Sequence, residues 1–136
     1  MKKIFLTTFL LGILFLSGIA QPSSPILSKQ LKISIVISTN DAETVWNAFR
    51  IANYAAGEKD SVSVFLLGKG VEVQKIKDKD FDVQDIMKQY LDNGGKILAC
   101  GTCLRMREME GTKQCPVSTL SELYELIKTS DKILTF

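Results

Sequence analysis

The chain has 136 residues, of which 17 are basic and 15 acidic, and it contains three cysteines but no histidine. The absence of histidine excludes Ser-His and Cys-His nucleophile pairs and every zinc site that uses a histidine ligand. The close balance of charges and the lack of a long basic block argue against nucleic acid as a partner. Any chemistry must therefore rest on cysteines, carboxylates or the backbone.

Residues 1–20 have the pattern of a secretory signal peptide. Two lysines precede an apolar core from Ile4 to Leu16, and small residues follow up to Ala20. The core is shorter than the ~20 residues that a membrane-spanning helix needs, so an uncleaved anchor is the less favoured alternative. We expect cleavage after Ala20, no stable membrane anchor afterwards, and an exported protein that is periplasmic or secreted.

The remainder of the chain predicts a short tether and one domain. Residues 21–31 are rich in proline and serine and are expected to form a flexible tether. Residues 32–136 are long enough for a single domain with its own core. Removal of the first twenty residues leaves 15 basic and 15 acidic side chains, so the processed chain is formally neutral.

The first half of the domain predicts two strands and a helix. Lys32 to Ser38 is a nearly continuous apolar run, typical of a strand buried on both faces. Asn40 is expected to cap a helix that ends at Gly57. Ser61 to Leu67 predicts the second strand, followed by a turn and a polar surface loop from Gly68 to Asp80. The apolar face of the helix is formed by Val45, Phe49, Ala52 and Ala56.

The next segment has the clearest helical pattern. Asp82 is expected to cap a helix that ends at Gly94 and Gly95. Lys96 to Cys100 then predicts a third strand, which leads directly into a short helix through about Met109. The apolar face of the longer helix is formed by Val83, Ile86, Met87, Tyr90 and Leu91.

The last segment predicts a minor strand, a helix and a closing strand. Gln114 to Val117 is expected at an edge of the sheet, because Pro116 lacks the N–H that a central strand needs. Thr119 and Glu122 form a capping box at the start of the helix, and Lys132 to Phe136 predicts the closing strand. The apolar positions of this helix are Leu120, Leu123, Tyr124 and Ile127.

The alternation of strands and helices predicts a small doubly wound α/β fold. Its sheet is expected to be mostly parallel with helices on both faces, since right-handed crossover helices connect parallel neighbours. Ligand chemistry in such folds gathers at the carboxyl ends of the strands, near the point where the strand order reverses. Cys100 is expected to lie at such an end.

Cys100 and Cys103 are the candidate catalytic residues. A helix start lowers the pKa of a thiol, and two cysteines three positions apart can also form a disulfide with each other. The alternative is a structural bridge or an inert pair, since exported proteins commonly use disulfides. A zinc site is disfavoured because Cys115 supplies only a third thiolate. No metal and no organic cofactor is expected.

The chain has three distinctive segments, which are Lys96–Arg107, Val83–Leu91 and Ser118–Phe136. Together they resemble the DsrE/DsrF-like family of sulfur-relay proteins, particularly its YchN-like branch. The most specific elements are the Cys-x-x-Cys pair with Arg107 seven positions after its first cysteine, and the ending Ser130–Phe136. The resemblance implies a doubly wound α/β fold and a homo-oligomer, either a trimer or a hexamer.

The resemblance also implies roles for individual residues. Cys100 matches the position at which sulfur-relay members carry a persulfide, and Cys103 would be the resolving partner. Arg105 and Arg107 are candidate substrate-binding residues for an anionic sulfur species, although exposed arginines are commonly plain surface. Many relatives place glycine where Glu108 stands here, and a carboxylate near a thiolate tends to raise the pKa of the thiol.

Three functions remain open from the sequence. The first is a sulfur carrier or sulfurtransferase that works with a sulfur donor or acceptor protein. The second is a thiol-disulfide oxidoreductase that cycles the same two cysteines. The third is a non-enzymatic oligomeric binding module in which the bridge is structural.

Overall fold

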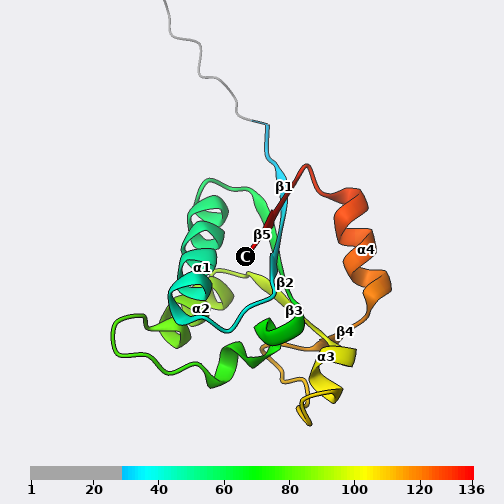
Figure 1. Ribbon diagram of the computed structural model, residues 1–136. Coiled ribbons are helices and arrows are strands. Elements are labelled where there is room, and N and C mark those ends of the chain that lie inside the picture. Colours follow the sequence, from blue (N-terminus) through cyan, green and yellow to red (C-terminus); the bar gives the residue numbers. More distant parts are fainter. Residues whose placement is uncertain (1–28) are drawn as a thin grey trace, which may run out of the picture.

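The computed structural model describes residues 29–136 (Figure 1). The predicted signal peptide and all but the last three residues of the predicted tether lie outside the described residues. Within the described part, no helix is long and apolar enough to cross a membrane. The elements in chain order are β1 (Lys32–Ile37), α1 (Ala42–Gly57), β2 (Ser61–Leu66), the 3-10 helix η1 (Gly68–Lys75), α2 (Val83–Asp92), β3 (Lys96–Cys100), α3 (Gly101–Arg105), β4 (Val117–Ser118), α4 (Leu120–Thr129) and β5 (Lys132–Thr135).

The five strands form one parallel sheet in the order β4-β3-β2-β1-β5. Helices α1 and α2 cover one face of the sheet and α4 covers the other (Figure 1). This arrangement confirms the predicted doubly wound α/β fold. Cys100 is the last residue of β3 and therefore lies at a carboxyl end of the sheet, as predicted. The strand order reverses between β1 and β5, so β2 and β1 separate β3 from the reversal.

The core is thickest on the side of α1 and α2. Phe49 of α1 and Tyr90 of α2 are fully buried, with ring centroids 5.9 Å apart. The Tyr90 hydroxyl donates a hydrogen bond of 2.8 Å to the carbonyl of Val62, which satisfies its buried polar atom. Each fully buried side chain of this size contributes roughly 1.5–3 kcal/mol. Ala55 rather than the predicted Ala56 is the last buried residue of α1, and Ala56 is only partly buried.

The helix caps follow the predictions with one shift. Asp82 accepts the N–H of Asp85 at the start of α2, as predicted. The cap of α1 is Asp41 rather than Asn40, since the Asp41 carboxylate accepts the N–H of Thr44. The amide of Asn40 is therefore free to reach a residue outside its own helix.

The loops differ more from the predictions. Gly68–Lys75 forms a 3-10 helix instead of a surface turn, because Val71 and Val73 are buried and hold it against the domain. Helix α3 ends at Arg105 rather than near Met109. Strand β4 comprises only Val117 and Ser118, one residue beyond Pro116, and pairs with the end of β3 at the edge of the sheet.

Helix α4 begins with the predicted capping box but packs only one side chain deeply. The Thr119 hydroxyl accepts the N–H of Glu122, and the Glu122 carboxylate accepts the N–H of Thr119. The same carboxylate accepts the Ser118 hydroxyl at 2.6 Å, and this bond is the largest cause of the lowered pKa of Glu122. Leu123 is buried, whereas the other predicted apolar positions, Leu120, Tyr124 and Ile127, are exposed.

Candidate functional site

The two candidate cysteines lie where β3 passes into α3. Cys100 is the last residue of β3 and the N-cap of α3, and it is 8% exposed. Cys103 lies within α3 and is partly exposed. All three cysteines of the chain are free thiols in this structure. The strand end thus presents one inner and one outer thiol.

Gly68 supplies a backbone donor to the outer thiol. Its N–H points at the Cys103 Sγ, 3.2 Å away, across 35 positions of sequence. Gly68 has a φ of 53°, a left-handed conformation that glycine adopts without strain. At Gly70, a Cβ would lie 2.0 Å from the carbonyl oxygen of Ile37, so the turn packs directly on the end of β1. The sequence pattern predicted a plain turn at these glycines, without this contact.

The environment of the Cys103 thiol contains opposing influences. Burial is the largest cause and raises its pKa, and the interaction with the neighbouring Cys100 thiol raises it further. The Gly68 N–H and the charge of Arg107 act in the opposite direction. The net direction is upward, so Cys103 is predominantly a neutral thiol at pH 7 with stabilising groups in place for its anion.

Arg107 is anchored to this site from two sides. Its Nε donates to the Glu72 Oε1 at 2.8 Å, and its Nη1 donates to the Cys103 carbonyl at 3.1 Å. Glu72 also accepts the Asn40 amide at 2.8 Å. The bond from Asn40 and then the bond from Arg107 lower the pKa of Glu72, so its carboxylate stays charged opposite the guanidinium. Asn40 and Glu72 were not predicted as site residues, because their separation from Arg107 along the chain hides the contact.

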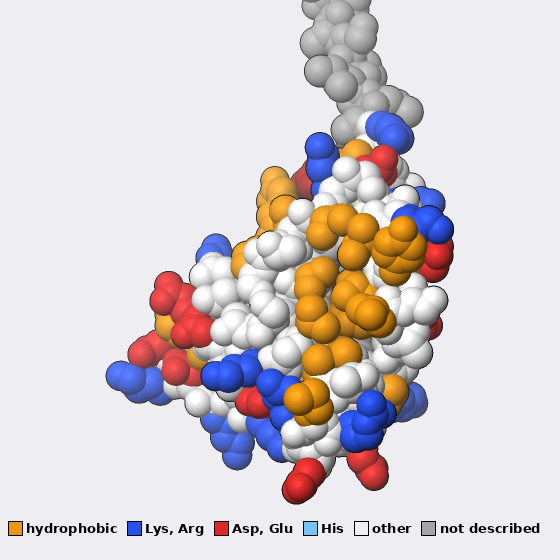
Figure 2. Space-filling view, turned by 45° about the vertical axis from the view of Figure 1, so that its right-hand side comes forward, with side chains coloured by type: hydrophobic (Ala, Val, Ile, Leu, Met, Phe, Trp, Pro, Cys, Tyr) orange, Lys and Arg blue, Asp and Glu red, His pale blue; other side chains and the backbone are white. Residues whose placement is uncertain are grey.

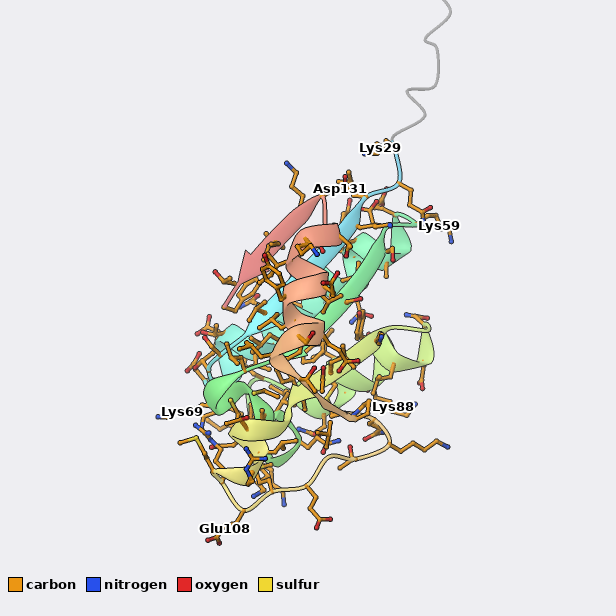
Figure 3. The ribbon with its side chains drawn as sticks, turned by 90° about the vertical axis from the view of Figure 1, so that its right-hand side faces the viewer. Lys29, Lys59, Lys69, Lys88, Glu108 and Asp131 are labelled. Atoms are coloured by element: carbon orange, nitrogen blue, oxygen red, sulfur yellow. The ribbon has the colours of Figure 1, made fainter. Side chains whose placement is uncertain are left out.

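Arg105 and Glu108 lie on the outside of this end of the molecule. The Arg105 side chain is exposed, and its Nη2 lies 3.5 Å from the Thr102 hydroxyl. Glu108 has a φ of 52°, which is strained for any residue other than glycine. Figure 3 places Glu108 and Lys69 at the end of the molecule opposite Lys29 and Asp131. The structure therefore gathers Cys100, Cys103 and Arg107 but leaves Arg105 in solvent.

Cys115 lies in a different setting, in the loop before β4. It is 4% exposed, and burial raises the pKa of its thiol to about 11. Two bonds of 3.0 Å close the loop, one from the Cys115 N–H to the Thr112 hydroxyl and one from the Thr112 N–H to the Cys115 carbonyl. Within residues 29–136, no group of three or more cysteine and carboxylate side chains is placed to hold a metal ion.

Comparison with known proteins yields one family and several relatives. The model of the DsrE/DsrF-like family matches residues 31–136. An uncharacterized protein of Methanocaldococcus jannaschii is 28% identical over 117 residues, which are 78% of this chain and 100% of that protein. An uncharacterized protein of Methanopyrus kandleri is 28% identical over 112 residues, which are 76% of this chain and 93% of that protein.

Two solved structures share the fold. The crystal structure of the YchN protein from E. coli has a TM-score of 0.68 at 19% identity, over 79% of this chain and 99% of that chain. The structure of a conserved protein of unknown function from Bacteroides thetaiotaomicron has a TM-score of 0.62 at 23% identity, over 77% of this chain and 94% of that chain. At these identities, both structures support the fold.

Proposed function

The chain belongs to the DsrE/DsrF-like family, and from this premise we propose that it carries sulfur as a persulfide on Cys100. The observation that supports the proposal most directly is the placement of two thiols where β3 passes into α3, with the Gly68 N–H donating to the outer one. A backbone donor and a fixed arginine stabilise negative charge on sulfur, which both thiolates and persulfide anions carry.

Loading is a sulfur transfer that needs no oxidant. The Cys100 thiolate attacks the outer sulfur of a donor persulfide, forming a new S–S bond while the donor's S–S bond breaks. The donor leaves as a thiolate and takes up the proton that the transferred S–H group releases. The terminal sulfur on Cys100 is then an anion, and Gly68 N–H and Arg107 lie on the side from which Cys103 approaches.

Release follows one of two balanced routes. An acceptor thiolate attacks the terminal sulfur and takes it, and Cys100 leaves as a thiolate. Alternatively, Cys103 attacks the Cys100 sulfur, which expels sulfide and forms a Cys100–Cys103 disulfide. An external dithiol then reduces this disulfide with two electrons. Arg107, held by Glu72, positions its charge beside Cys103 in both routes.

Measurement of cyanide-releasable sulfur tests the proposal. The purified protein is treated with a persulfide donor or with thiosulfate, and bound sulfur is quantified after cyanide treatment. We expect sulfur on the wild type and on Cys103→Ser, and none on Cys100→Ser. Cys115→Ser is the matched control and should load like the wild type, since Cys115 is buried in its loop. A wild-type protein that takes up no sulfur from either source would refute the proposal.

Export is a second part of the proposal, resting on the signal-like pattern of residues 1–20. The intact mass of the protein recovered from its host checks it directly. Cleavage after Ala20 gives a chain that begins at Gln21. A mass that corresponds to the full chain would contradict cleavage, and the same spectrum reports any disulfide or added sulfur.

A further inference from the structure

A groove lies between α1 and α2 on the outer side of the domain. The two helices run side by side over one face of the sheet (Figure 1). We call the hollow between them the α1–α2 groove, and its volume is about 610 Å³. Small-molecule sites in proteins occupy roughly 300–1,000 Å³, so the groove has the size of such a site. It is lined by Asn47, Arg50, Ile51, Asn53, Tyr54 and Ile86.

The walls of the α1–α2 groove are mostly apolar. Ile51 and Tyr54 are the two large hydrophobic side chains of α1 that are exposed, at 38% and 68%, and both line the groove. Ile86 of α2 is partly buried and packs against the core. Surface helices ordinarily place polar residues at exposed positions. The groove therefore offers a surface on which an apolar body can lie.

Arg50 is the one charged residue among the described residues that line the groove, and it is held in place. Its Nη1 donates to the Asn47 Oδ1 at 3.1 Å, and its guanidinium carbon lies 4.6 Å from the centre of the Trp46 ring. Within residues 29–136, Arg50 forms no ion pair. An oriented guanidinium without a counter-charge is suited to a carboxylate, which it binds through two parallel hydrogen bonds.

A buried acceptor at the groove lacks a partner. The Asn53 Nδ2 donates to the Phe49 carbonyl at 3.1 Å and to the Ile86 carbonyl at 3.0 Å. Both partners are acceptors, so the amide cannot be reversed, and no donor of residues 29–136 reaches its buried Oδ1. An unpaired buried acceptor is costly, and a ligand with an N–H or O–H group supplies the missing bond.

The hollow on α4 shows what the α1–α2 groove has in addition. Figure 2, in which the α4 side comes forward, shows hydrophobic side chains as a continuous band on this face. The described residues that line the α4 hollow include no charged one, so nothing there orients a charged ligand. The α1–α2 groove combines apolar walls with a fixed cation and an unpaired acceptor. Specific small-molecule sites use this combination of many apolar and few polar groups.

We propose that the α1–α2 groove binds a small organic carboxylate that has an aromatic or branched aliphatic body and one hydrogen-bond donor. The carboxylate pairs with Arg50, the body lies against the apolar walls, and the donor bonds to the Asn53 Oδ1. Arg50 and Asn53 are three positions apart on α1, so a molecule that spans about 5–6 Å reaches both. Neither Cys100 nor Cys103 lines the groove, so this site is separate from sulfur transfer.

An NMR titration of the isotope-labelled protein with 4-hydroxyphenylacetate tests the site. The chain has a single tryptophan, so the indole N–H of Trp46 gives one signal, beside Arg50. We expect this signal to shift and to saturate with a Kd below about 1 mM. The uncharged 4-hydroxyphenylacetamide should bind at least about 10-fold more weakly than the acid, and phenylacetate, which lacks the hydroxyl donor, about 5-fold more weakly.

Substitutions locate the binding site in the groove. Arg50→Gln should weaken binding of the acid at least about 10-fold and should abolish the preference for the acid over the amide. Lys128→Gln is the matched control, because it removes the same charge from α4, on the other face of the sheet, and it should bind like the wild type. Cys100→Ser should also bind like the wild type, so the loss of this site and the loss of sulfur carriage are distinguishable.

Three results would overturn the proposal. They are a wild-type Kd above about 1 mM, equal affinities for the acid and the amide, and an Arg50→Gln variant that binds as tightly as the wild type. Equal affinities for 4-hydroxyphenylacetate and phenylacetate would remove Asn53 from the site. The same spectra report whether each variant is folded, and the comparison of acid and amide on the wild type requires no variant.

Discussion

Cys103 and Cys115 are two thiols that burial affects in the same direction but that lie in different surroundings. In both, burial is the largest cause of a raised pKa. Cys103 is partly exposed and meets the Gly68 N–H and the charge of Arg107, whereas Cys115 is enclosed in a loop closed by Thr112. Solvent access and fixed hydrogen-bond donors, rather than burial alone, therefore distinguish a thiol that is placed to react from one that only packs in the core.

The largest expected difference between these thiols is in their rate of alkylation. With iodoacetamide under native conditions, we expect Cys103 to react at least about 100-fold faster than Cys115, because a buried thiol reacts only after local opening. Peptide mapping by mass spectrometry measures both rates in one sample. Cys103→Ser should remove the fast phase, and similar rates at the two positions would break the comparison.

The second difference is the effect of alkaline pH on stability. The Cys115 thiol has an ordinary value of 9.0 and a folded pKa of about 11, so the unfolded chain loses this proton first as pH rises. The stability that the buried Cys115 thiol contributes is fully present below pH ~9 and is lost as pH rises toward ~11. The loss reaches about 1 kcal/mol by pH 10.

Chemical denaturation from pH 8 to pH 10 measures this effect. The free energy of unfolding of the wild type should fall more steeply with pH than that of Cys115→Ala, whatever their absolute stabilities. Tyr90, whose pKa burial raises to about 12, is common to both proteins. Parallel curves for the two proteins would show that Cys115 titrates normally in the folded state.

The backbone donor to Cys103 is expected to have the next largest effect. Gly68→Ala strains the left-handed turn by about 1 kcal/mol and displaces the N–H, which should slow alkylation of Cys103 about 5-fold at pH 8. Gly94→Ala is the matched control, since Gly94 has a φ of 83° and open space around it and lies beyond the end of β3 opposite to the cysteines. A slower rate in both variants would assign the effect to general destabilisation.

The smallest expected effect is that of the arginine charge. Arg107→Gln removes a positive charge that lowers the pKa of Cys103, so the pH profile of alkylation should move upward and the rate at pH 8 should fall about 3-fold. Arg105→Gln should change neither the pH profile nor the rate. The Arg105 side chain is exposed, and its hydrogen-bond partner within residues 29–136 is the Thr102 hydroxyl. Equal effects of the two substitutions would contradict a specific role for Arg107.

Local signals in the sequence predicted most of the fold. Caps such as Asp82 and the Thr119–Glu122 box are read from residues three positions apart, and buried strands such as β3 are read from a short apolar run. The prediction of Asn40 as the cap of α1 was wrong by one residue, because the neighbouring Asp41 is an equally good cap and accepts the N–H of Thr44. The Asn40 amide contacts Glu72 instead.

The candidate site was only half predictable for the same reason. The Cys100–Cys103 pair is a local pattern, but the contacts from Gly68 to Cys103 and from Glu72 to Arg107 each join segments 35 positions apart. The buried Val71 and Val73 were an alternating apolar signal within a polar stretch, and they indicate that the segment packs on the domain. Glu108 has a left-handed conformation, which a glycine at this position would adopt without strain.

Ser118 connects α4 mechanically to the cysteine strand. It pairs with Cys100 in the sheet through its backbone, while its hydroxyl is bonded to Glu122 at the start of α4. The start of α4 and the end of β3 therefore share one anchor residue, which ties the helix to the backbone beside Cys100.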